Sequence, residues 1–178
     1  MEVITLESLK DTITAISPIE CMSLTEHCIC ALEHNDHISG CRITVSGINF
    51  TNFTINWTTK INKAGYQNTN VFIERGALAL SFFLCVQFTG YTVIQQAQIG
   101  TGVDYWLGYD KEHNQYDPKN FLRARLEVSG INNETNKNNI ARRLRNKKSQ
   151  TAKSDAKRLP AFISIIEFAS PKAHFEEK

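Results

Sequence analysis

Three acidic residues of this sequence, Glu74, Asp104 and Glu127, have the types and positions best suited to a chemical reaction. Asp104 and Glu127 fall on neighbouring segments that have the alternating pattern of strands, so antiparallel pairing would bring their carboxylates close together. Paired carboxylates are preferred ligands of Mg²⁺, which keeps waters and a substrate phosphate in its remaining positions. A hydroxide activated by such a cation could attack a phosphodiester bond.

A purely structural role is the alternative for the same carboxylates. Acids on strands commonly face solvent or pair with arginine, and this sequence offers Arg123, Arg125 and Arg142 as partners. For an isolated pair of strand acids the structural role is the better supported choice. The order of the surrounding elements is what raises the weight of the catalytic interpretation.

The chain from residue 71 onward has a regular order of predicted elements. Residues 71–88 are apolar nearly all round, which predicts a buried helix that ends at Gly90. Alternation of apolar and polar residues then predicts three strands, over residues 91–98, 103–108 and 121–131. A tight turn, Gly100-Thr101-Gly102, joins the first two of these strands.

The remaining part of this region predicts a helical crossover. A basic helix is expected over about residues 135–150, and the near-continuous apolar run 161–169 is typical of a strand inside a sheet. A helix between two strands normally places them side by side and parallel. The order is therefore helix, three strands, helix, strand, which predicts an α/β or α+β fold with a mixed sheet.

The N-terminal region predicts an accessory layer of helices and a hairpin. Apolar residues at helical spacing predict a helix over residues 4–16 that Pro18 ends, and a second helix is expected over residues 23–35. Alternation over residues 41–58 predicts a β-hairpin. We therefore expect two parts, an accessory layer over residues 1–66 and a core over residues 67–178.

The basic residues are concentrated in one segment. The whole chain has a net charge of +2, but nine Lys or Arg and one Asp lie between Lys137 and Arg158, a local charge of +8 that leaves −6 elsewhere. No acid is interleaved to form pairs along the helix, so we expect most of this charge to be exposed and to bind nucleic acid. The expected nucleic-acid contacts are Arg142, Arg143, Arg145, Lys147, Lys148 and Lys172.

Length and composition are those of an ordinary globular protein. The chain has 178 residues, 42% hydrophobic and 21% charged, which excludes disorder, collagen and coiled coil. No uninterrupted apolar run approaches the roughly 20 residues that cross a bilayer, and the N-terminus lacks a signal-peptide pattern. We therefore expect a cytoplasmic protein with five reduced cysteines. A zinc site is disfavoured, because Cys28 and Cys30 would point about 200° apart on a helix.

The order of elements and acids resembles the PD-(D/E)XK nuclease superfamily, which includes many restriction endonucleases and Holliday-junction resolvases. The resemblance covers residues 71–171 and implies a restriction-endonuclease-like mixed sheet. It implies that Asp104 and Glu127 bind Mg²⁺ or Mn²⁺, with Glu74 as the helix acid that many members carry. Ser129 stands where the superfamily usually has a lysine that orients the attacking water. Another cation would have to take that role, and the candidates are Lys172, Arg125 and Arg142.

These observations predict a metal-dependent nuclease, or a nuclease subunit, that hydrolyses phosphodiester bonds in DNA. Its catalytic residues would be Asp104, Glu127, Ser129 and Glu74. The alternative is a catalytically inactive subunit with the same fold that binds nucleic acid or a larger protein partner. The N-terminal layer is available for homodimerisation or for docking such a partner, and no membrane association is expected. No motif supports a small-molecule or ATP-binding enzyme.

Overall fold

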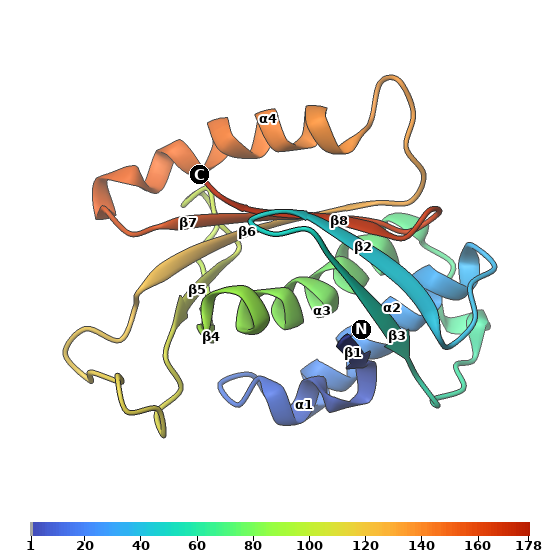
Figure 1. Ribbon diagram of the computed structural model, residues 1–178, viewed down its shortest axis with the longest axis horizontal. Helices are drawn as coiled ribbons and strands as arrows, with labels where there is room; N and C mark the ends of the chain where they lie inside the picture. The colour runs from blue at the N-terminus through green and yellow to red at the C-terminus, as the bar shows by residue number, and fades with distance from the viewer. Residues whose placement is uncertain (1) are drawn as a thin grey trace.

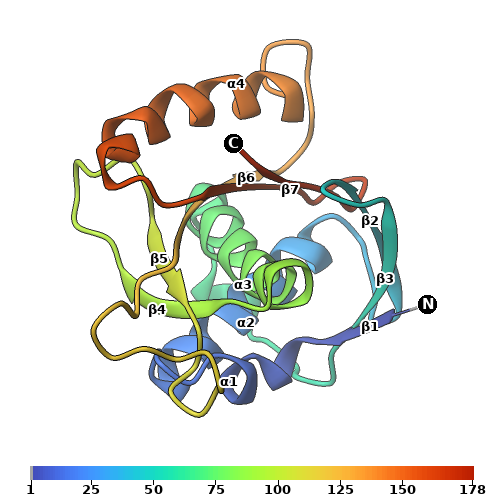
Figure 2. The ribbon, with the colours of Figure 1, turned by 60° about the vertical axis from the view of Figure 1, so that its left-hand side comes forward.

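A mixed sheet of eight strands runs through the protein and curves over a long central helix (Figures 1 and 2). The structure is a computed structural model and describes residues 2–178. The strands are β1 (Glu2–Thr5), β2 (Cys41–Gly47), β3 (Thr51–Asn56), β4 (Thr92–Gln96), β5 (Tyr105–Gly108), β6 (Ala124–Ile131), β7 (Ala161–Glu167) and β8 (Lys172–Glu177). Their order in the sheet is β1-β3-β2-β8-β7-β6-β5-β4.

Helices cover both faces of this sheet. They are α1 (Leu9–Thr12), α2 (Pro18–His34), α3 (Thr69–Thr89) and α4 (Ile140–Thr151), with short 3-10 turns η1 (Leu6–Ser8), η2 (Lys63–Gly65) and η3 (Ala152–Lys157). Figure 1 shows α4 above the sheet and α1, α2 and α3 below it. The fold is therefore mixed α/β, as the sequence predicts.

The predicted order of elements in the C-terminal part is confirmed. Gly90 caps the C-terminal end of helix α3 and has a positive φ of 70°. Strands β4, β5 and β6 pair antiparallel in sequence order, and the crossover through α4 places β7 parallel to β6. The apolar positions of β6 and β7 are buried, among them Ala124, Leu126, Val128, Phe162, Ile163 and Ile165.

The N-terminal prediction is wrong at two places. Residues 2–5 form β1, parallel to β3, and only Leu9–Thr12 forms α1 where a helix over residues 4–16 was expected. Pro18 begins α2, because a proline at the first helical position loses no hydrogen bond and Ser17 accepts from the Glu20 N–H at 3.3 Å. The predicted hairpin is present as β2 and β3.

Strand β8 is an element that the sequence analysis did not predict. It pairs antiparallel with β7 and parallel with β2, so it joins the N-terminal hairpin to the C-terminal strands in one sheet. The alternation of apolar and polar residues in β8 is short, because only Ala173 and Phe175 are apolar and buried. A run of this length between charged residues gives a weak strand signal.

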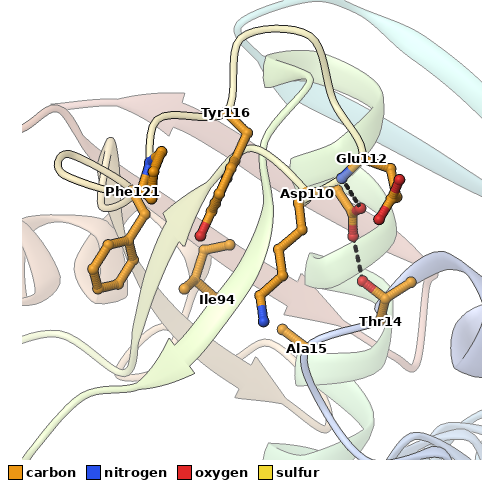
Figure 3. Close-up of a pocket in the computed structure, with 9 residues that line it drawn as sticks. Thr14, Ala15, Ile94, Asp110, Glu112, Tyr116 and Phe121 are labelled. Carbon is orange, nitrogen blue, oxygen red and sulfur yellow. Dashed lines mark hydrogen bonds between the residues drawn. The ribbon is translucent and has the colours of Figure 1, made fainter.

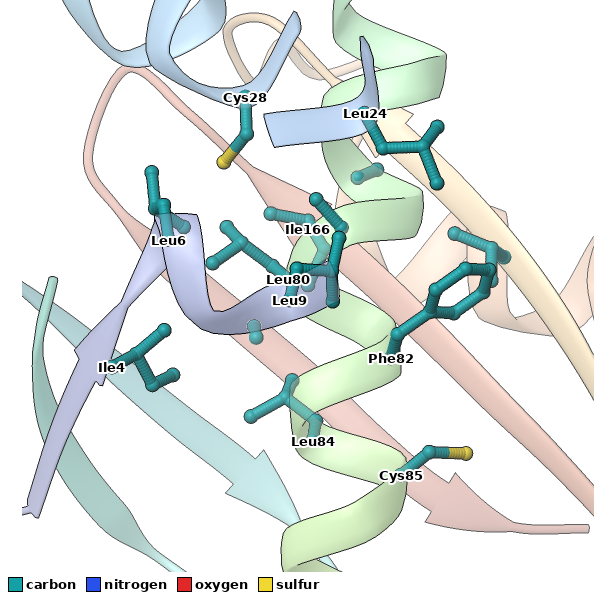
Figure 4. Close-up of a cluster of buried hydrophobic side chains, with 14 of the residues drawn as sticks. Ile4, Leu6, Leu9, Leu24, Cys28, Leu80, Phe82, Leu84, Cys85 and Ile166 are labelled. Carbon is teal, nitrogen blue, oxygen red and sulfur yellow. The ribbon is translucent and has the colours of Figure 1, made fainter. Parts of the chain in front are cut away.

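Helix α3 lies in the core between the sheet and the N-terminal helices. It is long and apolar enough to cross a membrane by length and composition, but it is largely buried within the protein. Figure 4 shows Leu80 and Leu84 among side chains from η1, α1 and β7, including Leu6 and Ile166. Each such buried side chain contributes about 1.5–3 kcal/mol to stability. This arrangement is that of a core helix and is compatible with a soluble protein.

Strand β6 is buried on both faces, and this feature positions the acidic residues. Leu126 and Val128 face the side of α3, while Glu127 and Ser129 face the side of α4. Acids on strands commonly face solvent, which is one alternative for Glu127. Instead α4 and η3 cover the polar face of β6, so its polar side chains require partners from those elements.

Replacing Gly130 by alanine is expected to lower the free energy of unfolding by about 1–3 kcal/mol. A Cβ at this position would lie 2.5 Å from the carbonyl oxygen of Ile73, so β6 and α3 would have to move apart. Gly65→Ala is the matched control, because a Cβ there meets nothing within 4 Å. Urea denaturation measures both variants. Equal stabilities would contradict this close contact between β6 and α3.

Candidate active site

The candidate site forms where β5 begins beside β6. Within the described residues β5 pairs with β6 only at Ala124–Leu126, so the rest of β6 has one edge free of strand pairing. Asp104 lies immediately before β5, and its N–H donates to the Leu126 carbonyl at 2.9 Å. Its Oδ2 accepts the N–H of Val128 at 2.8 Å. This register places Asp104 directly across from Glu127, as expected from the antiparallel arrangement.

The carboxylate of Glu127 is fully buried beneath this edge. Its Oε1 accepts from the Lys147 ammonium, in an ion pair, and from the Gln150 amide at 2.9 Å. Its Oε2 is buried without a hydrogen-bond partner in the described structure. The pKa of Glu127 is raised to about 7, chiefly by burial and next by the neighbouring charge of Asp104, while Lys147 opposes the shift. Two carboxyl groups therefore share a small, poorly solvated volume.

Two cations of α4 lie over the same face of β6. Lys147 and Arg143 are four residues apart, so they share one side of the helix. The guanidinium of Arg143 is fixed by Asn138, which accepts from Nε at 2.7 Å, and it reaches the hydroxyl of Ser129 at 3.4 Å. Ser129, the residue that the sequence analysis compared with a lysine, thus contacts an arginine.

A cavity of about 300 Å³ opens above these residues. Glu74 of α3, Asp104, Ser129, Arg143 and Lys147 all line it. Glu74 is exposed at the cavity. Glu127 is buried below the cavity and does not line it, but its carboxylate pairs with Lys147 and lies near Asp104, which both line the cavity. The structure therefore brings the four predicted catalytic residues into one neighbourhood, with two cations that the sequence analysis assigned to nucleic-acid binding.

The three cations proposed as substitutes for the superfamily lysine lie elsewhere. Arg125 is on the same strand face as Glu127, but its guanidinium is held by Asp155 at 3.2 Å and by the hydroxyl of Ser154 at 2.8 Å. Lys172 pairs with Glu134 at 2.6 Å. Arg142 is exposed on the outer side of α4. The cation that contacts Glu127 is Lys147.

The predicted nucleic-acid contacts divide into paired and exposed residues. Lys147 and Lys172 have the carboxylate partners given above, and Lys148 pairs with Glu176 at 2.5 Å. Arg142 and Arg145 are exposed and have no ion pair within residues 2–178. Acids from other elements therefore pair with Lys147 and Lys148. Most of the charge of the segment is exposed, as expected, on Lys137, Arg142, Arg145, Lys153, Lys157 and Arg158.

Sequence reasoning missed the contact of Lys147 with Glu127. A signal for it exists, because Lys147 lies three and seven residues after Leu144 and Ile140, the apolar residues that pack α4 onto the sheet. A lysine on the packed face of a helix needs a buried acid as its partner. The polar face of β6 supplies one in Glu127.

The largest of the described cavities lies away from these carboxylates. It has a volume of about 720 Å³ and lies between the loop after α1 and the loop after β5 (Figure 3). Ile94, Tyr116 and Phe121 line it, and Asp110 accepts from the Thr14 hydroxyl and from the Glu112 N–H. It lies at the Gly108 end of β5, opposite to the Asp104 end. Size alone therefore does not identify the reactive site.

Comparisons with protein-family models, with characterised proteins and with solved structures found no match for this chain.

The free energy of unfolding of the wild type, relative to Glu127→Gln, is expected to fall as pH rises from 4.5 to about 7. In this range the folded protein retains a proton that the unfolded chain has released, so the difference decreases by at most about 1.4 kcal/mol per pH unit. Urea denaturation at several pH values, without divalent cations, measures this difference. A difference that rises or stays constant across the range would contradict the raised pKa.

Proposed function

We propose that this protein is a metal-dependent nuclease that cleaves DNA, with a restriction-endonuclease-like core from α3 to β7. The observation that carries the proposal is the buried Glu127 carboxylate beside Asp104, with Lys147 in contact and one oxygen unpartnered. The order of α3, β4, β5, β6, α4 and β7 supports it. So does the distribution of acids, with Glu74 on α3, Asp104 immediately before β5 and Glu127 on β6.

The donor atoms of this site suit Mg²⁺ or Mn²⁺. Within residues 2–178 no group of three or more His, Cys, Asp or Glu side chains is arranged to hold a metal ion. Mg²⁺ does not need such a group, because it is commonly bound by one or two carboxylates together with waters and substrate phosphates. The unpartnered Oε2 of Glu127 lacks a bond that a cation would supply. Asp104 and Glu127 are therefore the residues that would hold the metal.

The other groups of the cavity have roles set by their charge. A bound cation would polarise the phosphate and stabilise its negative charge. Lys147 places an ammonium beside the carboxylates, where it can orient the attacking water and stabilise charge that develops on the phosphate. Glu74, exposed at the cavity, can accept a proton from that water. Arg143, held by Ser129 and Asn138, can bind a phosphate oxygen.

A non-catalytic subunit with the same fold is the second candidate. Lys147 already neutralises one oxygen of Glu127, and Ser129 provides no charge at the position of the superfamily lysine. In such a protein the acids and cations would be a buried structural network, and only the exposed cations of α4 would bind nucleic acid. Cleavage assays separate the two candidates.

Cleavage of DNA is expected to require Mg²⁺ or Mn²⁺ and to be lost in Asp104→Asn and Glu127→Gln. Both substitutions keep the shape of the side chain and remove its charge, so DNA binding should remain, because exposed cations supply most of the affinity. Gel assays with single- and double-stranded substrates measure cleavage, and filter binding measures affinity. Cleavage that persists in either variant would contradict the assignment of these ligands.

Lys147→Ala is expected to lower kcat about 100- to 1000-fold, because one donor that stabilises developing charge is removed. Adding Ser129→Lys to this variant should restore part of the rate, since residue 129 is on the same face of β6 as Glu127. Lys63→Ala is the matched control, because it breaks a remote ion pair with Glu33 at 3.3 Å. No cleavage by the wild type under any condition would favour the non-catalytic subunit.

A further inference from the structure

A second depression in the surface lies beside the candidate active site. It has a volume of about 540 Å³ and is lined on one side by the turn between β4 and β5 and on the other by the end of α4 and the start of η3. Its lining residues are Gly100, Gly102, Asn146, Ser149, Gln150 and Lys153. They offer amide, hydroxyl and ammonium donors, and none of them is acidic. A surface of this composition attracts an anion.

The turn is held firmly against the helix. The N–H and the hydroxyl of Thr101 both donate to the carbonyl of Gln98, at 3.2 and 2.7 Å. Gly102 has a φ of 77°, and a Cβ there would lie 2.3 Å from the carbonyl oxygen of Gln150. Only glycine fits this conformation and this close approach. The turn therefore has a fixed position at the border of the depression.

Two backbone donors of this turn are free. The N–H groups of Gly100 and Gly102 donate to no acceptor within the described part of the chain. Backbone N–H groups of turns that contain residues with positive φ commonly bind anions. Together with the ammonium of Lys153 they provide the donors that a phosphate group requires.

The depression is connected to the candidate site through one side chain. Gln150 lines the depression, and its amide donates to Oε1 of Glu127 at 2.9 Å. A DNA strand with one phosphate at the carboxylates would therefore have other phosphates near this depression.

The outer side of α4 continues the same positive surface. Arg142, Arg145 and Ser149 are spaced by three or four residues, so they lie on one side of the helix, and Lys153 follows in η3. Lys147 and Arg143 face the opposite way, toward β6. The helix thus has an inner side that serves the carboxylates and an outer side that leads to the depression.

We propose that this depression is a phosphate subsite that holds a DNA backbone phosphate other than the one at the carboxylates. The inference rests on the proposed nuclease function. It assigns Lys153 and the Gly100-Thr101-Gly102 turn to substrate positioning, with no part in bond cleavage. Phosphate contacts of this kind fix the register of a protein on DNA.

The test uses the full chain and a series of DNA duplexes, each with one neutral methylphosphonate at a different backbone position. In the wild type, a methylphosphonate at the phosphate that occupies the subsite should weaken DNA binding. In Lys153→Ala, a methylphosphonate at that one position should no longer weaken binding, and the effects at all other positions should be unchanged. Lys153→Ala should also reduce the slope of log affinity against log salt concentration by about 0.9. Lys60→Ala, an exposed lysine near the other end of the sheet, should change neither quantity.

The outcomes separate this inference from the proposed function. If Lys153→Ala keeps either the wild-type methylphosphonate profile or the wild-type salt slope, the subsite is wrong, while metal-dependent cleavage by the wild type would still support the nuclease. If the wild type binds no duplex at low salt, the subsite and the proposed function both fail. Should Lys153→Ala prove unstable, Ser149→Ala is the second variant, and an unchanged profile there would also count against the subsite.

Discussion

The burial of the Glu127 carboxylate is the constraint on which this end of the molecule depends. A buried carboxylate is unfavourable unless it is paired, and here its partners, Lys147 and Gln150, come from a helix that lies over the sheet. The segment antiparallel to β6 adds a second carboxylate, Asp104, whose charge raises the free-energy cost of ionising Glu127. A buried ion pair rarely stabilises more than apolar residues of the same volume would. Stability alone therefore gives no reason for this arrangement, whereas the proposed binding of a cation and a phosphate would.

Helix α4 links this buried site to the protein surface. Its inner side carries Lys147 and Arg143 against the polar face of β6, and its outer side carries Arg142 and Arg145 without carboxylate partners in the region that the structure describes. The excess of positive charge in this segment thus has two separate uses. Part of it neutralises acids that belong to other elements, and the remainder is free to bind an anion. Net charge along the sequence does not distinguish these two uses.

Strong periodicity made the C-terminal order of elements predictable, and the placement of Asp104 opposite Glu127 followed from strand alternation. Local patterns failed where tertiary contacts decide the outcome. Strand β1 forms because it pairs with β3, and Pro18 begins a helix although the residue before it fits a helix end equally well. Lys147 was assigned to the surface because its partner is 20 residues away in the sequence. The sequence indicates the contact of Lys147 with a buried acid only through the position of this lysine on the packed side of α4.

The most direct test of the account is the location of a divalent cation in a crystal of the full chain soaked in Mn²⁺. Anomalous scattering identifies the ion independently of any enzymatic activity. The account predicts one peak within coordination distance of the carboxylates of Asp104 and Glu127, with Oε2 of Glu127 as a ligand. Absence of a peak there at saturating Mn²⁺, with Lys147 still paired to Glu127, would contradict the metal-dependent site.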